Sequence, residues 1–276
     1  LIDDEIQILL SKSAIQISNP EKDEFISNIF LVQKKNGKYR PVINLKGLNQ
    51  YVKYFHFKQE NLQSVLLNIS KNDYFTSIDL CDAYFSISMN KKCRKYLKFV
   101  WKDQIYEFTC LCFGLASAPR IFTKLMKVVF SHIRNQGVGS FFYIDDSLLH
   151  SPYENNCYEN TVMLRNLLHS LGFLVNKEKS VFIPTQRIIF LGYLIDSVQF
   201  KVFLTEEKIQ KILKSANKIY SLYNPVIREV SSLIGLFTSA SCAVLLAPIF
   251  HRYLDIEKTL ALSKNNDNYD GIMSLS

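Results

Sequence analysis

The cysteines of this 276-residue sequence lack the spacing that a metal site or a disulfide framework requires. Six are present, and none forms a Cys-x-x-Cys pair or lies near two histidines at ligand spacing. Neither a zinc finger nor a small disulfide-stapled fold is therefore indicated. We expect reduced thiols in an intracellular protein.

Targeting and membrane-spanning patterns are also missing. The first residues lack an initiating Met and the basic-then-apolar pattern of a signal peptide, so we expect a piece of a longer polyprotein. Residues 230–251 are uncharged and approach the ~20 residues of a bilayer span. They contain Ser, Thr, Gly and Pro and lack flanking loop cations, so we expect a helix–turn–helix on a soluble core and no membrane partner.

Two segments contain no acidic residue at all. Residues 25–58 and 91–102 are rich in Lys and Arg, and the second also holds Tyr96, Phe99 and Trp101. The whole chain has 33 Lys and Arg against 25 Asp and Glu, a net charge of +8. One such segment alone would be interpreted as a solvated face, but two, mixed with aromatics, favour phosphate contact and base stacking by a nucleic-acid-binding protein.

Hydrophobic periodicity predicts a strand-rich body followed by helices, an α+β fold. Hairpins are predicted at 28–33 with 39–45 and at 97–101 with 105–110, and strands at 75–80, 140–144, 147–150, 173–175, 181–183 and 188–195. A helix capped by Ser117, with Pro119 in its first turn, is predicted to end before Gly137. Further helices are predicted over 154–171 and 205–222 and from residues 224 and 248.

Three carboxylates occupy positions where apolar strands normally exclude charge. Asp79 lies inside a strand pattern, and Asp145 and Asp146 are adjacent at a turn between apolar strands. Burying an unpaired carboxylate is costly, and neighbouring carboxylates repel each other. Two Mg²⁺ ions about 4 Å apart would offset both costs and serve phosphoryl transfer. An exposed turn is the ordinary interpretation of an Asp-Asp pair alone, but this combination favours a metal site.

Four segments resemble motifs of reverse transcriptases, and they follow one another along the chain in the same order as in that family. Residues 143–146 (YIDD) resemble the YxDD motif, and residues 77–85 (SIDLCDAYF) the first aspartate motif. Residues 113–119 (FGLASAP) are similar to the FGLxxAP segment of long-terminal-repeat retroelements, and residues 190–193 (FLGY) to their primer grip. The likeness covers about residues 27–195. Cys112 departs from the pattern, since many relatives carry Pro there.

This resemblance implies a role for each matching position. Asp79, Asp145 and Asp146 would bind two Mg²⁺ ions, with Mn²⁺ as an alternative, and Lys179 would protonate the departing pyrophosphate. The deoxynucleoside triphosphate (dNTP) would be bound by Lys34, Lys35, Arg40, Asp82, Ala83, Tyr84, Phe113 and Gly114, with Tyr84 excluding a ribose 2′-hydroxyl. The primer grip would consist of Phe190, Leu191, Gly192 and Tyr193. A core aromatic at Tyr84 and exposed surface lysines are the competing interpretations.

The fold implied by the resemblance is a right-hand polymerase. Fingers and a palm with an antiparallel sheet would span residues 1–200, a helical thumb 201–265, and the start of a connection or ribonuclease H region 266–276. The implied function is that of a retrotransposon RNA-directed DNA polymerase, which uses dNTPs to extend a primer on an RNA or DNA template.

Finer details resemble DIRS-type retrotransposons, which carry a tyrosine recombinase. The resemblance is carried by residues 42–49 (VINLKGLN), 95–97 (KYL), 119–124 (PRIFTK) and 251–258. Three alternatives stay open: a catalytically decayed, transposon-derived nucleic-acid-binding domain, an RNA-binding module, and an RNA-templated RNA polymerase. Clustered carboxylates would repel phosphate in a binding module without metal, and an RNA polymerase needs room for a 2′-hydroxyl where Tyr84 stands.

Overall fold

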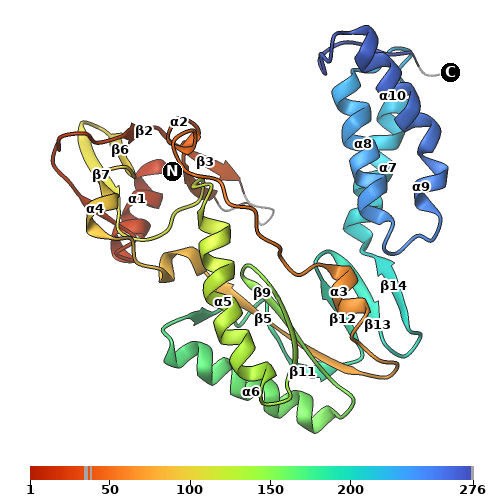
Figure 1. Ribbon diagram of the computed structural model, residues 1–276, viewed down its shortest axis with the longest axis horizontal. Coiled ribbons are helices and arrows are strands. Elements are labelled where there is room, and N and C mark those ends of the chain that lie inside the picture. The colour runs from red at the N-terminus through yellow and green to blue at the C-terminus, as the bar shows by residue number, and fades with distance from the viewer. Residues whose placement is uncertain (34–36, 38, 275–276) are drawn as a thin grey trace. The chain divides into compact units, whose positions relative to one another are not determined.

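The structure is a computed structural model that describes residues 1–33, 37 and 39–274. Its contacts divide the chain into two compact units. Unit 1 comprises Leu1–Glu60, Ser77–Leu149 and Glu159–Phe182, and unit 2 comprises Asn61–Thr76, His150–Tyr158 and Ile183–Ser276. Figure 1 traces the chain through its helices and strands.

The first part of unit 1 combines small sheets with short helices. A four-stranded sheet has the order β1-β7-β6-β2, and β3 pairs with β4. The elements are α1 (Ile2–Ser11), β1 (Ile15–Ile17), β2 (Ile26–Ser27), β3 (Ile29–Gln33), β4 (Tyr39–Ile43), α2 (Lys46–Asn49), α4 (Lys91–Arg94), β6 (Lys98–Trp101) and β7 (Gln104–Phe108). Both predicted hairpins are confirmed, as β3–β4 and β6–β7. The predicted turn at 34–38 lies outside the described residues except for Gly37.

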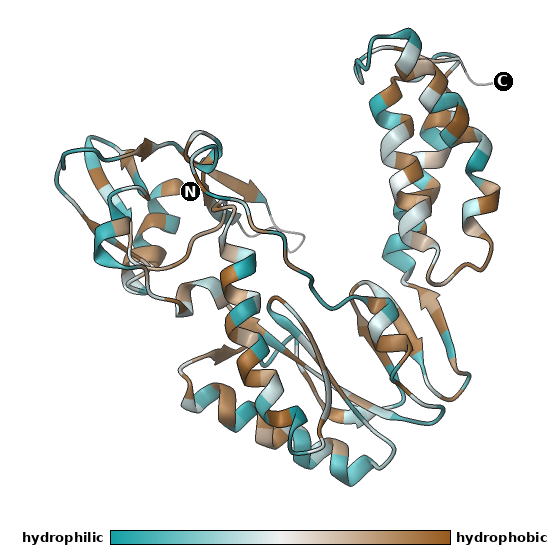
Figure 2. Cartoon of the chain, viewed as in Figure 1, coloured by the Kyte–Doolittle hydropathy of each residue, from teal (hydrophilic) through white to brown (hydrophobic). Residues whose placement is uncertain are grey.

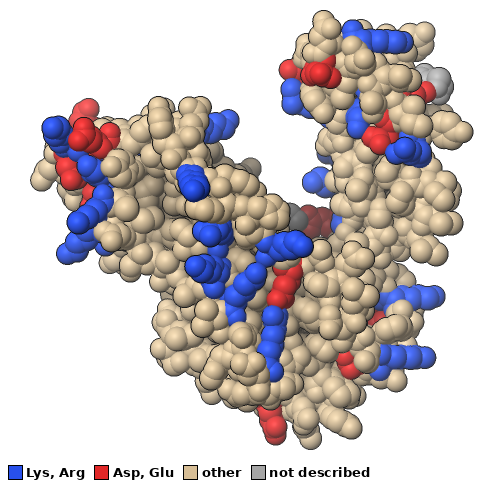
Figure 3. Space-filling view, viewed as in Figure 1, with Lys and Arg blue, Asp and Glu red and all other residues tan. Residues whose placement is uncertain are grey.

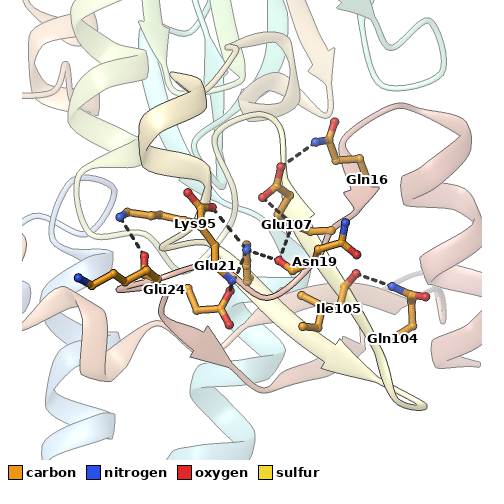
Figure 4. A network of polar contacts seen from close by, with 11 residues as sticks. Gln16, Asn19, Glu21, Glu24, Lys95, Gln104, Ile105 and Glu107 are labelled. Carbon is orange, nitrogen blue, oxygen red and sulfur yellow. Dashed lines mark hydrogen bonds and ion pairs between the residues drawn. The ribbon is translucent and has the colours of Figure 1, made fainter.

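A buried lysine fastens the N-terminal segment to the four-stranded sheet. The Lys98 side chain on β6 is fully buried, and its Nζ donates hydrogen bonds of 2.8 Å to the Asn19 carbonyl and to Glu24 Oε2. Nearby, Gln16 Nε2 donates to Glu107 Oε1 at 2.7 Å (Figure 4). A buried charge is tolerated when it is paired and hydrogen-bonded, so these contacts hold residues 16–24 against the sheet.

The second part of unit 1 is a sheet packed against two helices. Its strands have the order β10-β5-β9-β8, with β11 also paired to β5. The elements are β5 (Tyr74–Cys81), the 3₁₀ turn η1 (Ala83–Ser86), α5 (Ala118–Arg134), β8 (Gly139–Tyr143), β9 (Asp146–Ser151), α6 (Glu154–Ser170), β10 (Leu174–Val175) and β11 (Val181–Thr185). Four of these, β5, β9, α6 and β11, continue from one unit into the other.

Alternation along β5 decides which side chains face the helices. Hydrophobic and hydrophilic residues alternate around α5 (Figure 2), and the Phe130 ring of α5 stacks on Phe142 of β8 at 4.7 Å. Ile78 and Leu80 lie in the same core as these aromatics. Because successive strand residues point to opposite faces, Asp79 is turned to the face away from that core.

The start of α5 differs from the prediction. Ser117 makes no side-chain capping bond, because its backbone is already helical, with φ −84° and ψ −14°. An N-cap residue needs an extended backbone to reach the free amides, so the predicted cap is wrong. Pro119 does lie in the first turn, and the helix ends before Gly137, whose φ is +85°.

Unit 2 contains a three-stranded antiparallel sheet and a helical bundle. The elements are α3 (Leu62–Leu66), β12 (Arg187–Phe190), β13 (Tyr193–Asp196), β14 (Lys201–Leu204), α7 (Glu206–Tyr220), α8 (Ile227–Ala240), α9 (Ala247–Phe250) and α10 (Arg252–Lys264). Ile219, Val230, Leu233 and Leu262 form the core of the bundle. The predicted helical segment after residue 205 is confirmed, and all six cysteines are free. Among the described helices, none is both long enough and apolar enough to cross a bilayer.

The single strand predicted over 188–195 is wrong. Residues 187–196 form the β12–β13 hairpin, in which Phe190 pairs with Tyr193 across the two-residue turn Leu191-Gly192. Both turn residues have positive φ, +51° and +77°, as type I′ hairpin turns require. Leu is uncommon in that conformation, so the apolar run concealed the turn.

Candidate active site

Backbone contacts join the two acidic segments in unit 1. The Leu80 amide donates to the Asp145 carbonyl at 3.0 Å, and the buried Ser147 hydroxyl donates to the Ile78 carbonyl at 2.9 Å. Asp146 is the first residue of β9, and Ile144, just before the pair, has φ +54°. A β-branched residue with positive φ is a strained exception to normal backbone preference. The turn that presents Asp145 is thus fixed beside the strand that bears Asp79.

Asp79 lies close enough to Asp145 and Asp146 to raise the pKa of both of these carboxyl groups. Burial raises the pKa of Asp145, and the Asp79 charge raises it further. The pKa of Asp146 is raised by burial, then by the charges of Asp145 and Asp79, and the Asp79 side chain lies within hydrogen-bonding reach of Asp146. Like charges held together favour the protonated form. The structure therefore brings the three predicted carboxyl groups together, and the nearby cations do not cancel the upward shifts in pKa.

Hard oxygen ligands and excess negative charge are what a site for Mg²⁺ needs, and these three side chains supply both. Throughout the described residues, however, no three His, Cys, Asp or Glu side chains are already arranged round one point as metal ligands. Metal ligation requires carboxylate oxygens that converge on one point. Rotation about χ1 brings oxygens together more easily than a movement of the strands does, and the strands already hold the three side chains close to one another. The donor set fits a divalent cation.

A loop after β10 contacts Asp79 from the other side. The Asn176 amide donates to the Asp79 carbonyl at 2.8 Å, and the Asp79 amide donates to Ser180 Oγ at 3.0 Å. Lys179, in the same loop, places its Nζ 3.6 Å from Asp79 Oδ2, with its side chain 66% exposed. Two predicted site residues, Lys179 and Asp79, are thus neighbours, and the lysine keeps access to solvent.

Replacing Asp146 by Asn should stabilise the metal-free protein. The pKa of this carboxyl group is higher in the folded state than in the unfolded state. The group therefore destabilises the folded protein when the pH rises above the unfolded-state pKa. The loss of stability grows with pH until the pH exceeds the folded-state pKa. Removing the charge should increase the free energy of unfolding at pH 8 in EDTA by about 1–2 kcal/mol, after allowance for partial exposure. At pH 4 the difference should be much smaller. Thermal denaturation at both pH values measures it.

A matched control is Asp103→Asn, which removes an exposed carboxylate from the β6–β7 turn. It should leave stability nearly unchanged at both pH values, because exposed charges contribute little. Equal stability of Asp146→Asn and wild type at pH 8 would contradict the repulsion assigned to the three carboxyl groups.

Aromatic side chains line the region in front of the carboxylates. Tyr84 is 6% exposed, and its ring packs 5.1 Å from Phe113 and 5.6 Å from Phe122 between centroids. Burial and the Asp145 charge raise the pKa of Tyr84 to about 12. The Arg40 guanidinium lies 4.4 Å above the Phe113 ring. Tyr84 is therefore a core aromatic in its packing, yet it is also a neighbour of the acidic cluster.

The predicted nucleotide-binding residues that the structure describes lie in unit 1, around the aromatic rings of Tyr84 and Phe113. A small pocket in unit 1, with a volume of about 40 Å³, is lined by Arg40, Asp82 and Phe113, among others. Ala83 is buried beside Tyr84 in the core. Lys34 and Lys35 lie outside the described residues.

Gly114 is held where no side chain fits. Its φ is +103°, and a Cβ there would lie 2.5 Å from the Ile43 carbonyl oxygen. Asn49 fastens the same loop, since its Nδ2 donates to the Gly114 carbonyl at 2.8 Å and its Oδ1 accepts from the Ala116 amide at 2.9 Å. This role of Asn49 has no signature in the sequence, because no local pattern links residues 49 and 114.

Gly114→Ala should destabilise unit 1 by about 2–4 kcal/mol, because strain at positive φ adds to a clash with backbone. Gly235→Ala is the matched control. Its added Cβ meets nothing within 4 Å in helix α8, so stability should stay constant or rise by up to about 1 kcal/mol. Urea denaturation of both variants measures the contrast, and a Gly114→Ala variant as stable as wild type would show that the loop relaxes freely.

The predicted primer-grip residues lie in unit 2, on the β12–β13 hairpin. Phe190 and Tyr193 are buried, and Leu191 and Gly192 form the turn. The Tyr193 hydroxyl donates to the Ser239 carbonyl, and Lys208 Nζ lies 3.7 Å above the Tyr193 ring. Lys208 Nζ also donates to the Ser239 carbonyl at 3.0 Å. The hairpin is thereby tied to helices α7 and α8.

Basic side chains gather on one face of unit 1. Figure 3 shows Lys and Arg over α5 and over the segment that precedes α3, with few acidic residues among them. Helix α5 contributes Arg120, Lys124, Lys127 and Arg134. Arg120 lies 4.5 Å above the Phe55 ring, and Lys53 lies 5.0 Å from the same ring. Such a mixture of cations and aromatics suits a polyanion that also carries stackable bases.

Curated proteins similar to this chain are transposon polyproteins. The curated relatives include the Retrovirus-related Pol polyprotein from transposon opus of Drosophila melanogaster, 31% identical over 185 residues, which are 65% of this chain and 18% of that protein. Another, the Transposon Tf2-3 polyprotein of Schizosaccharomyces pombe, is 27% identical over 186 residues, 67% of this chain and 14% of that protein. The chain thus spans less than a fifth of these relatives.

Solved structures of foamy viral protease-reverse transcriptase share the fold. One in complex with double-stranded DNA has a TM-score of 0.79 at 22% identity, and one in complex with an RNA/DNA hybrid has 0.77 at 21%; they cover all of this chain and 45% and 34% of theirs. The predicted α+β, right-hand polymerase fold is confirmed. The family model for reverse transcriptase (RNA-dependent DNA polymerase) matches residues 32–195, which include all three carboxylates, and the chain belongs to that family.

Proposed function

We propose that this chain is the polymerase part of an RNA-directed DNA polymerase, which extends a primer by adding dNTPs on an RNA or DNA template. The observation that carries the proposal is the grouping of Asp79, Asp145 and Asp146 on the face of the sheet away from its helices. Partly buried carboxyl groups that lie together are unfavourable unless cations offset their charge, and bound metal ions would do so.

Asp79, Asp145 and Asp146 would hold two Mg²⁺ ions, or Mn²⁺ in their place. When bound, such ions stabilise the attacking and the leaving oxygen of an in-line displacement. In that displacement the primer 3′-oxygen bonds to the α-phosphorus, and the bond from that phosphorus to pyrophosphate breaks. The protein then mainly positions the reactants.

Cationic side chains would bind the triphosphate and protonate the leaving pyrophosphate. The Arg40 guanidinium, fixed by its contact with Phe113, offers a planar fork to phosphate oxygens. Lys34 and Lys35 would act on the same triphosphate as point charges. Lys179, exposed and adjacent to Asp79, would donate a proton to pyrophosphate as it leaves.

The floor of the sugar pocket would be formed by Tyr84. Its ring is buried between Phe113 and Phe122, and this packing prevents the ring from moving aside to accommodate a 2′-hydroxyl. Asp82 and Ala83 would border the sugar, and Phe113 and Gly114 would lie beneath the base. The product would then be DNA.

Partners and boundaries of the larger protein follow from the same proposal. Template, primer and dNTPs would be its ligands, with Phe190, Leu191, Gly192 and Tyr193 supporting the primer end. Residues 1–200 would form fingers and palm, residues 201–265 the thumb, and residues 266–276 the start of a connection or ribonuclease H region. The chain would belong to a polyprotein with a ribonuclease H, as its curated relatives are themselves polyproteins.

Within retroelements we propose a DIRS-type origin. Support comes from residues 42–49, 95–97, 119–124 and 251–258, which resemble that group. The test is genomic: a tyrosine recombinase gene in the same element would support the proposal, and an integrase gene in its place would refute it.

A catalytically decayed nucleic-acid-binding domain is not favoured, because the three carboxylates and Lys179 are all retained and adjacent. The deciding experiment is primer extension by the purified chain with Mg²⁺ and a primed RNA template. Incorporation of dNTPs supports the polymerase. Binding of the primed template without any incorporation, in Mg²⁺ or Mn²⁺, would support the decayed domain instead.

A further inference from the structure

Helix α1 is anchored so that the lysine at its end has a defined place. Asp3 near the helix start accepts hydrogen bonds from the Trp101 indole at 2.8 Å and from Lys102 Nζ at 3.0 Å. Leu9 is buried in the core of unit 1, and the following strand β1 pairs with β7. Lys12 is the C-cap residue of this helix, and its amide donates to carbonyls of the last turn.

Lys12 reaches across the chain to Asp82. Its Nζ lies 2.7 Å from Asp82 Oδ2, and the two side chains are 45% and 33% exposed. Asp82 has φ +48°, a left-handed conformation, and directly precedes Ala83 and Tyr84. Lys12 also lines the small pocket that Asp82 shares with Arg40. The ion pair therefore lies at the wall of a pocket that it shares with Arg40 and Phe113, two residues proposed to bind the nucleotide.

We propose that Lys12 is a positioning residue for the incoming nucleotide, acting through Asp82; this inference rests on the proposed polymerase function. A carboxylate at the wall of a triphosphate pocket repels the triphosphate unless a cation neutralises it. Lys12 supplies that cation and holds the backbone of residue 82 in its left-handed form. Without it, the Asp82 charge would face the ligand unpaired.

Lys12 lies outside the segment that the family model matches. The family match begins at residue 32, and Lys12 precedes it by twenty positions. The two partners are 70 residues apart in sequence, so the contact has no local signature. Lys12, at the end of helix α1, would thus contribute to nucleotide binding from a segment that precedes the matched residues.

The test compares Lys12→Ala with Lys22→Ala, which removes an exposed lysine that lies outside the pocket lining and outside both acid-free segments. The readouts are KM and kcat for dTTP in primer extension, and equilibrium binding of dTTP to the protein with primer–template and Ca²⁺, which needs no turnover. Lys12→Ala should raise KM and Kd for dTTP about 5-fold, the upper range for an exposed pair, with kcat changed less than about 2-fold. Lys12→Arg should restore wild-type values, and Lys22→Ala should match wild type.

Double substitution separates this role from general stability. In an Asp82→Asn background, Lys12→Ala should cause a much smaller rise in Kd for dTTP, because the carboxylate that pairs with Lys12 is gone and only Glu5 of the pocket lining keeps a negative charge. An equal rise in both backgrounds, or no rise with Asp82 intact, would overturn the proposal. Failure of the wild type to extend a primer would refute the polymerase function alone, since the dTTP-binding measurements still decide the role of Lys12.

Discussion

Primer extension by the Asp145→Asn variant is expected to fall by at least about 10³-fold. Asn keeps the size of the side chain but removes a charged ligand, and the loss of about 4 kcal/mol of transition-state stabilisation corresponds to that factor. The variant should fold normally, because the Asp145 pKa is raised by burial and by Asp79 and the substitution relieves that repulsion. Single-nucleotide incorporation under single-turnover conditions measures the rate.

Asp23→Asn provides the matched control for Asp145→Asn. It replaces an exposed aspartate in the turn before β2, remote in sequence from the acidic cluster, and should retain full activity. Thermal denaturation of both variants excludes unfolding as the cause of any loss. Retention of more than about a tenth of wild-type activity in Asp145→Asn would remove this residue from the chemistry.

Tyr84→Ala is expected to let the enzyme incorporate ribonucleotides. Selectivity for deoxynucleotides should fall on the order of 10²-fold, the range that steric exclusion in a pocket provides. The same substitution should cost about 3–5 kcal/mol of stability, because the ring is 6% exposed and packed against Phe113 and Phe122. Selectivity is a ratio of two kcat/KM values for the same preparation, so partial unfolding leaves it unchanged.

Tyr84→Phe retains the ring and removes only the hydroxyl, and it should keep the wild-type preference for deoxynucleotides. Should Tyr84→Phe and Tyr84→Ala lose selectivity equally, a polar contact of the hydroxyl would be responsible and not the bulk of the ring. Unchanged selectivity in both variants would mean that Tyr84 serves only the core.

Local patterns predicted the parts of the fold that local forces decide. The β3–β4 and β6–β7 hairpins and helix α5 follow from alternation, turn residues and helical periodicity, and the structure contains them. The β12–β13 turn was missed because Leu191 adopts a positive φ that its residue type disfavours. Long-range packing of the hairpin outweighs that local preference there.

The candidate site was predictable where its residues belong to recurring motifs. Asp79, Asp145 and Asp146 were singled out from sequence, and the structure places them together. Lys12, Asn49 and Ser180 were not singled out as site residues. Each acts through a contact with a residue at least 65 positions away, and the identity of such partners depends on the complete fold. Polar residues of this kind are indistinguishable in sequence from ordinary surface residues.

The central claim is that the three carboxylates form one site for divalent cations. Titration of the chain with Mn²⁺, followed by electron paramagnetic resonance of the free ion, tests it without requiring catalysis. The account predicts about two bound ions per wild-type chain in the presence of primer–template and dNTP, and a loss of binding in the combined Asp79→Asn, Asp145→Asn, Asp146→Asn variant. Equal binding by the wild type and the combined variant would contradict it.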